Sequence, residues 1–245
     1  MLGLVVLWIK LRRNGYTRSI TSLYRVMQRL GIYKKAPSKK KKYEPKPYQQ
    51  MTHPGERVQI DVKYVPLSCM TKEIKEIDGR YYQYTAIDEY TRQRVLWASK
   101  EHSTYASAEF LDIVVNKFKY PIECIQTDNG FEFTNKLNSK KAKEKTIFEI
   151  KLDKLGIKHK LIRPRTPRHN GKVERSHRND NERFYNTLII NSLEELRKKG
   201  KNYLERTNKI PMACLNYLTP LEKRKELIIS LLIQYNTFIS LVNAK

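Results

Sequence analysis

Three acidic residues of this sequence lie where carboxylates can gather around a divalent cation. Asp61 lies inside an alternating apolar and polar stretch, 57–66, that predicts a β-strand, and aspartate is disfavoured in the middle of a strand. Asp128 directly follows a shorter predicted strand, and Glu174 falls in the first turn of a helix predicted to begin at Gly171. Ligands of open α/β sheets bind at the carboxyl ends of strands, and Mg²⁺ prefers carboxylate oxygens. The three acids are therefore candidates for a hard-cation site.

Each acid also has an interpretation without any function. Asp61 can be a solubility charge on an edge strand. Asp128 begins the strong turn signal Asp128-Asn129-Gly130, and Glu174 can complement the dipole of its helix. Taken one at a time, the three positions favour these structural interpretations, so their meaning depends on the elements that position them.

The hydrophobic periodicity predicts strands followed by alternating helices and strands. Strands are expected over 57–66, 80–89, 92–100, 122–127 and 157–162, and helices over 104–118, 146–155 and 171–185. The short Tyr90-Thr91 link makes the second and third strands a hairpin, and Thr104 is expected to cap the first of these helices. Three antiparallel strands followed by this alternation predict an α/β fold with a mixed five-stranded sheet flanked by helices.

The charge of the chain is large and unevenly placed. The 245 residues carry 49 Lys and Arg against 25 Asp and Glu, a net charge of +24, and residues 1–50 alone hold +12 of it. Such a field favours a polyanion, with nucleic acid as the expected partner and a solvated basic tail as the alternative. Three scattered cysteines without a CxxC exclude a disulfide framework or zinc ribbon and favour a reducing compartment. An apolar run of about 18 residues is absent, so no membrane association is expected.

The N-terminal region predicts a short basic helix followed by a linker. Ser19 can cap the helix and Gly31 can end it, with an apolar stripe made by Leu23, Val26, Met27 and Leu30. The arginines off this stripe, which can face DNA, are Arg18, Arg25 and Arg29. The pattern resembles the second helix of a helix-turn-helix, and an ordinary amphipathic surface helix is the alternative. The Lys- and Pro-rich segment 34–50 should be extended along phosphates, with DNA contacts from Lys39, Lys40, Lys41 and Lys42.

Four segments, taken together and in order, point to one family. They are QIDVKYV, AIDEYTR, QTDNGFEF and RPRTPRHNGKVERSHRNDNERFY. Over roughly residues 15–225 the chain resembles the catalytic core of bacterial insertion-sequence transposases related to retroviral integrases, the DDE recombinases with an RNase H-like fold. By that resemblance Asp61, Asp128 and Glu174 are the catalytic and metal-binding triad, holding two Mg²⁺ or Mn²⁺ ions per active site that support in-line displacement at phosphorus.

The resemblance also implies how DNA is held. Phosphate contacts are expected from six cations around Glu174, namely Arg163, Arg165, Arg168, Lys172, Arg175 and Arg178. The residues three, four and seven positions after Glu174 are His177, Arg178 and Asn181, a polar stripe that predicts a helix face toward DNA. The expected partners are the DNA element ends and the target DNA, with a homodimer or larger synaptic assembly joining the two ends.

Four regions follow from these patterns. They are a partial helix-turn-helix segment at 1–33, a basic linker at 34–52, an integrase-type catalytic core at 53–190 and a C-terminal helical segment at 191–245. The expected function is that of a transposase that binds terminal inverted repeats, cleaves DNA at the element ends and joins them to a target. Its expected location is the bacterial cytoplasm, at the nucleoid.

Two departures from the family keep alternatives open: only the second half of a helix-turn-helix is recognisable, and the apolar C-terminal stretch 227–242 looks unlike the family. Between Asp128 and Glu174 lie 45 residues, more than the family usually has, but this insert removes no metal ligand. One alternative is a metal-dependent nuclease of the same fold without strand transfer, which the basic N-terminal region argues against. The other is a catalytically inactive or decayed transposase remnant that acts only as a DNA-binding protein.

Overall fold

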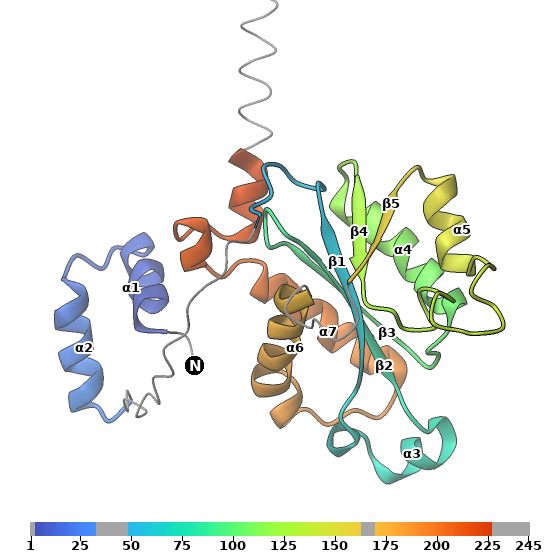
Figure 1. The fold of residues 1–245 in the computed structure, drawn as a ribbon. Helices are drawn as coiled ribbons and strands as arrows, with labels where there is room; N and C mark the ends of the chain where they lie inside the picture. Colours follow the sequence, from blue (N-terminus) through green and yellow to red (C-terminus); the bar gives the residue numbers. More distant parts are fainter. Residues whose placement is uncertain (1–2, 33–48, 163–169, 227–245) are drawn as a thin grey trace, which may run out of the picture.

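The computed structural model describes residues 3–32, 49–162 and 170–226, and within them a five-stranded sheet organises the fold. The strands are β1 (Val58–Tyr64), β2 (Tyr82–Asp88), β3 (Arg94–Ser99), β4 (Cys124–Thr127) and β5 (Lys158–Leu161). Their order is β3-β2-β1-β4-β5 (Figure 1). The β1-β2 and β2-β3 pairs are antiparallel, whereas β4 runs parallel to both β1 and β5. The predicted mixed five-stranded sheet and the predicted hairpin are confirmed.

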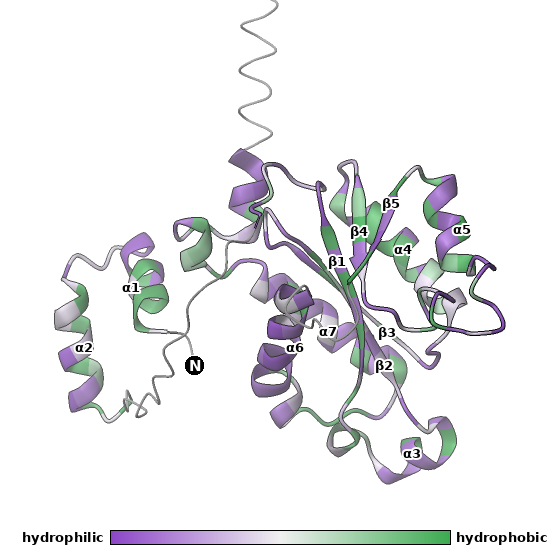
Figure 2. Cartoon of the chain, viewed as in Figure 1, coloured by the Kyte–Doolittle hydropathy of each residue, from purple (hydrophilic) through white to green (hydrophobic). Residues whose placement is uncertain are grey.

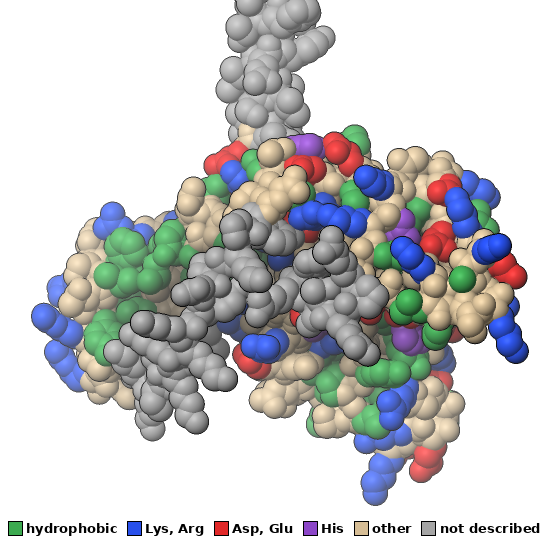
Figure 3. Space-filling model, viewed as in Figure 1, with side chains coloured by type: hydrophobic (Ala, Val, Ile, Leu, Met, Phe, Trp, Pro, Cys, Tyr) green, Lys and Arg blue, Asp and Glu red, His purple; other side chains and the backbone are tan. Residues whose placement is uncertain are grey.

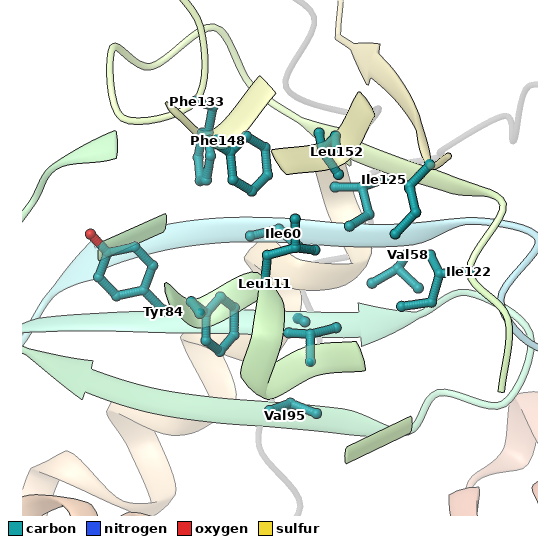
Figure 4. Packing of buried hydrophobic residues seen from close by; sticks show 14 of the residues in the cluster. Val58, Ile60, Tyr84, Val95, Leu111, Ile122, Ile125, Phe133, Phe148 and Leu152 are labelled. Carbon is teal, nitrogen blue, oxygen red and sulfur yellow. The ribbon is translucent and has the colours of Figure 1, made fainter. Parts of the chain in front are cut away.

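One face of the sheet carries the apolar core. The helices α4 (Thr104–Phe118) and α5 (Ile147–Lys154) cover it, and α4 contacts β2 and β3. Strand residues alternate between faces, so Val58 and Ile60 of β1 point together into this layer. They pack against Phe110, Leu111 and Phe148 with no exposed surface (Figure 4). The alternating pattern that predicted β1 therefore also identifies which of its residues face the apolar core.

The opposite face is covered by a polar helix and a second apolar cluster. The helix α6 (Gly171–Arg183) packs on β1 and β2, and α7 (Leu193–Thr207) packs on β3. Figure 2 shows α6 as largely hydrophilic, although it lies against the sheet. On this side of the sheet the apolar contacts are made by a second buried cluster, which includes Tyr81, Ile190 and Leu196. Polar contacts must therefore hold α6 in place.

Local sequence signals set most helix ends. Thr146 forms a capping box with Glu149 at the start of α5, as a Thr-x-x-Glu sequence dictates. The predicted cap of α4 is wrong by one residue: Ser103 accepts the Ala106 amide, while the Thr104 hydroxyl accepts the Phe148 amide and links α4 to α5. The short α3 (Lys72–Asp78) was not expected; it joins β1 to β2 and ends at Gly79 with φ +69°.

The N-terminal region forms a pair of helices. The helices α1 (Leu4–Arg13) and α2 (Ile20–Arg29) contact each other, and Ser19 caps α2 by accepting the Ser22 amide. Arg13 ties α1 to the core's C-terminal end through Glu222 at 2.8 Å. Of the expected apolar stripe only Leu23 and Met27 are buried, whereas Val26 and Leu30 are exposed. None of the helices in the described ranges is both long and apolar enough to span a membrane.

Candidate active site

Strand register and helix packing bring the elements of the three acids together. Asp61 lies at the middle of β1, opposite Thr85 of β2. In the parallel β1-β4 pair Gln59 lies opposite Gln126, and continuing that register sets Asp128, just after β4, level with Asp61. Glu174 is in the first turn of α6, the helix that packs on β1. The mixed sheet thus turns three positions that are distant in sequence into neighbours.

The three carboxylates influence one another electrostatically. Burial, followed by the charge of Asp128, raises the pKa of Asp61 to about 7, with further contributions from Glu174 and Glu132. Burial raises the pKa of Asp128, and partial burial together with Asp128 raises that of Glu174. Removal from water and like charges both disfavour the ionised form. A cation among these oxygens would reverse both effects.

The side chains do not yet converge on one point. In the described parts of the chain, no group of three His, Cys, Asp or Glu is close enough to hold a metal ion. Asp61 accepts the Val62 amide at 3.0 Å, Asp128 accepts the Gly130 amide at 3.0 Å, and Glu174 is exposed on α6. The donor set is nevertheless made of hard carboxylate oxygens, which suits Mg²⁺ or Mn²⁺. Side-chain movement would be needed to bring the three carboxylates onto one cation.

A buried polar network fixes the start of α6 on β1. The Gln59 side-chain oxygen accepts the amides of Lys172 and Val173 at 3.2 and 3.1 Å, which supplies the helix with the cap that Asn170 does not give. The Gln59 amide donates to Glu89, which Arg57 and Lys172 also contact. Gln59 is two residues before Asp61 and Val173 is one before Glu174. This network therefore sets the position of Glu174 relative to β1.

Comparison with known proteins places this geometry in a family. Two models described as integrase core domain match the chain, one over residues 51–167 and one over residues 155–220. Residues 51–220 of this chain, which the two models cover together, belong to the integrase core domain family. Both matched segments include the elements that carry the acids: β1 and β4 fall in the first, and α6 falls in the second.

Curated relatives and a solved structure agree with this assignment. A putative integrase ORF3 of Spiroplasma virus SpV1-C74 is 32% identical over 174 residues, which are 66% of this chain and 46% of the relative. A retrovirus-related Pol polyprotein from transposon RE2 of Arabidopsis thaliana is 29% identical over 119 residues, 48% of this chain and 7% of the relative. The chain thus spans less than half the length of either relative.

The fold comparison gives the same architecture. A chain in the structure of the simian T-cell lymphotropic virus intasome with PP2A regulatory subunit B56 gamma superposes with a TM-score of 0.53 at 16% identity. The match covers 88% of this chain and 69% of that chain. The RNase H-like integrase fold expected from the sequence is confirmed.

A histidine-glutamate pair borders the acids of the integrase core. His102 Nε2 lies 2.8 Å from Glu132 Oε1, and the imidazole stacks on Tyr82 with ring centroids 5.0 Å apart. The Glu132 carboxylate folds back over Gly130, where an added Cβ would stand 2.4 Å from Glu132 Oε2. A side chain at position 130 would therefore displace the Glu132 carboxylate from this position. Glu132 belongs to the QTDNGFEF segment, but no sequence signal marked His102.

The His102 imidazole is expected to titrate above its usual range. The hydrogen bond that His102 donates to Glu132, with smaller contributions from the charges of Asp128 and Asp61, raises the pKa of His102. The imidazolium is therefore present below this raised pKa and loses its proton as the pH rises through it. An NMR titration should show this pKa falling toward the ordinary value in Glu132→Gln, and an unchanged pKa in that variant would refute the pairing.

The cap on α6 gives a second expectation. Gln59→Leu removes the acceptor of the Lys172 and Val173 amides, so their hydrogen exchange should quicken while amides in α7 keep wild-type rates. Misplacing a group that supports a metal ligand typically costs about 10- to 100-fold in activity or metal affinity. Gln28→Leu, on the exposed surface of α2, is the matched control. Unaltered exchange at both amides in Gln59→Leu would contradict the positioning role.

One residue of the polar stripe that was predicted to face DNA points toward the sheet instead. His177 is buried against the sheet: its Nε2 lies 3.0 Å from Thr85 Oγ1 and its Nδ1 3.5 Å from Asp61 Oδ2. Burial, and then the charge of Lys63, lowers the pKa of His177 to about 3, so the ring is neutral. Asn181 accepts from Lys63 at 2.6 Å. Arg178 and Asn181, the other two residues of the stripe, are exposed. Periodicity cannot distinguish a polar residue that meets a polar sheet face from one that meets solvent.

Only some of the residues that are expected to contact DNA lie in the described parts of the chain. Arg18, Arg25 and Arg29 are exposed on the N-terminal helix pair, and Figure 3 shows blue side chains along its outer side. Arg175 and Arg178 are exposed on α6, whereas the Lys172 amine pairs with buried Glu89. The remaining candidates lie outside the described residues: Lys39, Lys40, Lys41, Lys42, Arg163, Arg165 and Arg168.

Proposed function

We propose that this chain is a DDE-type transposase or integrase, a polynucleotidyl transferase that cleaves DNA at the ends of a mobile element and joins them to target DNA. The observation that carries the proposal is the coupling of Asp61, Asp128 and Glu174 on three converging elements of an integrase core. Relatives named as an integrase and as a transposon polyprotein support the same class of reaction.

Each acid is expected to contribute to the metal site from a different element. Asp61 lies on β1 and Asp128 directly follows the neighbouring strand β4, so the sheet fixes the backbone of both ligands. Glu174 completes the set from α6. Asp61, Asp128 and Glu174 would hold the divalent cations, two per site in our proposal, which would supply charge neutralisation at the scissile phosphate and acidify the attacking hydroxyl. Asp61 is the carboxylate whose pKa is influenced by both of the other acids. The surrounding network fixes the backbone that carries these groups beforehand, so closing the set around a cation would require side-chain movements alone.

The cationic surface supports DNA as the substrate. The chain carries +24 net charge, and Arg175 and Arg178 flank Glu174 on the exposed side of α6. We propose that these arginines hold backbone phosphates, while the α1–α2 pair and the basic linker bind terminal inverted repeats. Because two element ends must meet, a homodimer or larger synaptic assembly is the proposed working form.

A remnant that only binds DNA is the alternative. Two features favour an active enzyme over this alternative. All three carboxylates are present, and a buried network positions Glu174. A remnant without catalytic work would gain nothing from crowding three acids whose pKa values are raised.

A strand-transfer assay tests the proposal. Labelled duplexes that end in the repeats flanking the gene are incubated with the full chain, with and without Mg²⁺ or Mn²⁺. The proposal expects joined products that require the metal. Nicks without joined products would instead indicate a nuclease, and DNA binding without any product would indicate the remnant.

A further inference from the structure

A basic cavity lies between the N-terminal helix pair and the integrase core. It measures about 680 Å³ and is bounded by α1, one side of α6 and residues 207–214. The cations that line it are Arg92, Arg94, Lys172, Arg175 and Arg183, and no acidic residue is among the described residues of its wall. A cavity with this lining attracts an anion.

Two of these five cations already pair with buried carboxylates. Arg94 Nη2 contacts Asp180 at 2.6 Å, and the Lys172 amine pairs with Glu89. Arg92, Arg175 and Arg183, by contrast, form no ion pair with any described residue. The positive charge available to a ligand therefore comes mainly from these three arginines.

Arg92 is held in an unusual way. It lies in the β2-β3 connection with φ +62°, a left-handed conformation that is unfavourable for a residue with a side chain. Its Nη1 is buried and finds no hydrogen-bond partner within the described chain. Burial, and to a smaller extent the charge of Arg92, lowers the pKa of Lys172, which places the two cations near each other. Arg92 nevertheless lines the cavity, and a phosphate oxygen is the acceptor that a guanidinium group suits best.

The cavity is continuous with the groove of Glu174. Arg175 lines the cavity and also a shallow groove that contains Glu174, Arg178 and Asn179. A strand that crosses Glu174 would therefore reach Arg175 and then Arg92 on its way toward the N-terminal helices. This continuity favours a phosphate within a nucleic-acid backbone over a free anion.

We propose that this cavity binds a backbone phosphate of DNA next to the catalytic groove, with Arg92 as the contact that guides the strand from Glu174 toward α1. The proposal rests on the proposed function, because it takes DNA as the substrate. It adds a binding residue in the AIDEYTR segment, far in sequence from the arginines on α6.

The test measures DNA binding without catalysis. Fluorescence anisotropy of a labelled duplex is recorded in EDTA over a range of KCl concentrations for the full chain. Arg92→Asn removes the guanidinium but keeps a residue that tolerates positive φ, so the fold should persist. The expected result is several-fold weaker binding and a slope of log K against log salt reduced by about one.

Matched variants and outcomes keep the result specific. Arg92→Lys should restore most of the slope, while Lys72→Ala, an exposed cation on α3 at the opposite end of the sheet, should leave it unchanged. Wild-type affinity and slope in Arg92→Asn would overturn this inference alone. Absence of DNA binding by the wild type would overturn the proposed function as well. Calorimetric binding of inorganic phosphate that Arg92→Asn abolishes without affecting DNA would reassign the cavity to a free anion.

Discussion

Asp128→Asn and Asp61→Asn are each expected to lose metal-dependent DNA cleavage and joining by about 1000-fold or more while remaining folded. The reason is that each carboxylate supplies both a charge and an oxygen ligand, and the neutral amide of asparagine supplies no charge. Strand-transfer rates with excess Mg²⁺ measure the loss. Asp112→Asn, on the exposed face of α4, is the control and should keep wild-type rates. Activity within a few-fold of wild type in Asp128→Asn would contradict the assigned triad.

In the absence of metal, the same Asp61→Asn substitution should stabilise the fold relative to wild type at neutral pH. The fold raises the pKa of Asp61 to about 7, chiefly by burial and then by Asp128, whereas in the unfolded chain the carboxyl ionises near pH 4. The native state therefore binds this proton more tightly, and stability falls as the pH rises from about 4 through about 7. Asp61→Asn in EDTA should show a smaller fall in melting temperature over that interval. A steeper fall than in wild type would contradict this electrostatic account.

Asp180→Ala is expected to cost about 3–5 kcal/mol of unfolding free energy, because it leaves buried partners unpaired. Asp180 has no exposed surface and accepts from Arg94 at 2.6 Å, Gln83 at 2.9 Å and Tyr203 at 2.9 Å. Burial opposes its ionisation, but Arg94 and the hydrogen bonds together hold the pKa of Asp180 below its usual value. Urea denaturation followed by circular dichroism measures the loss.

The matched control for this prediction is an exposed pair. Asp112→Ala breaks a contact with Lys151 on the surface of α4 and α5, where an ion pair contributes at most about 1 kcal/mol. Equal destabilisation by Asp112→Ala and Asp180→Ala would show that burial does not set the cost. The stability from Asp180 should also decline at low pH, since an acid with a lowered pKa contributes above its unfolded pKa and loses that contribution as it is protonated.

Local patterns predicted the elements because their causes are local. Alternation in 57–66 predicted β1 and its apolar face, and the Ser19 and Thr146 caps follow from side chains that bond amides three residues away. The position of Asp61 on a strand and of Glu174 in a first helical turn followed from the same patterns. Their assembly required the register of β1 with β4, which no single segment carries.

The parts that sequence patterns did not predict depend on contacts between distant residues. Gln59 reaches the α6 amides 113 and 114 positions away, and Arg57 meets Glu89 32 positions away. The inward direction of His177 was missed because a polar stripe that packs on polar strand residues has the same periodicity as one in solvent. His102 was missed because its ion-pair partner, Glu132, lies 30 positions away in the sequence and meets it only in the folded chain.

The most direct test of the central claim is to locate a bound metal. Crystals of the full chain equilibrated with Mn²⁺ would be examined by anomalous diffraction, with Asp61→Asn crystals as the reference. We predict manganese peaks between the Asp61 and Asp128 carboxylates, with Glu174 rotated to join them and the peaks lost in the variant. Manganese bound elsewhere, or carboxylates at Asp61 and Asp128 that stay without a peak at saturating Mn²⁺, would contradict the account.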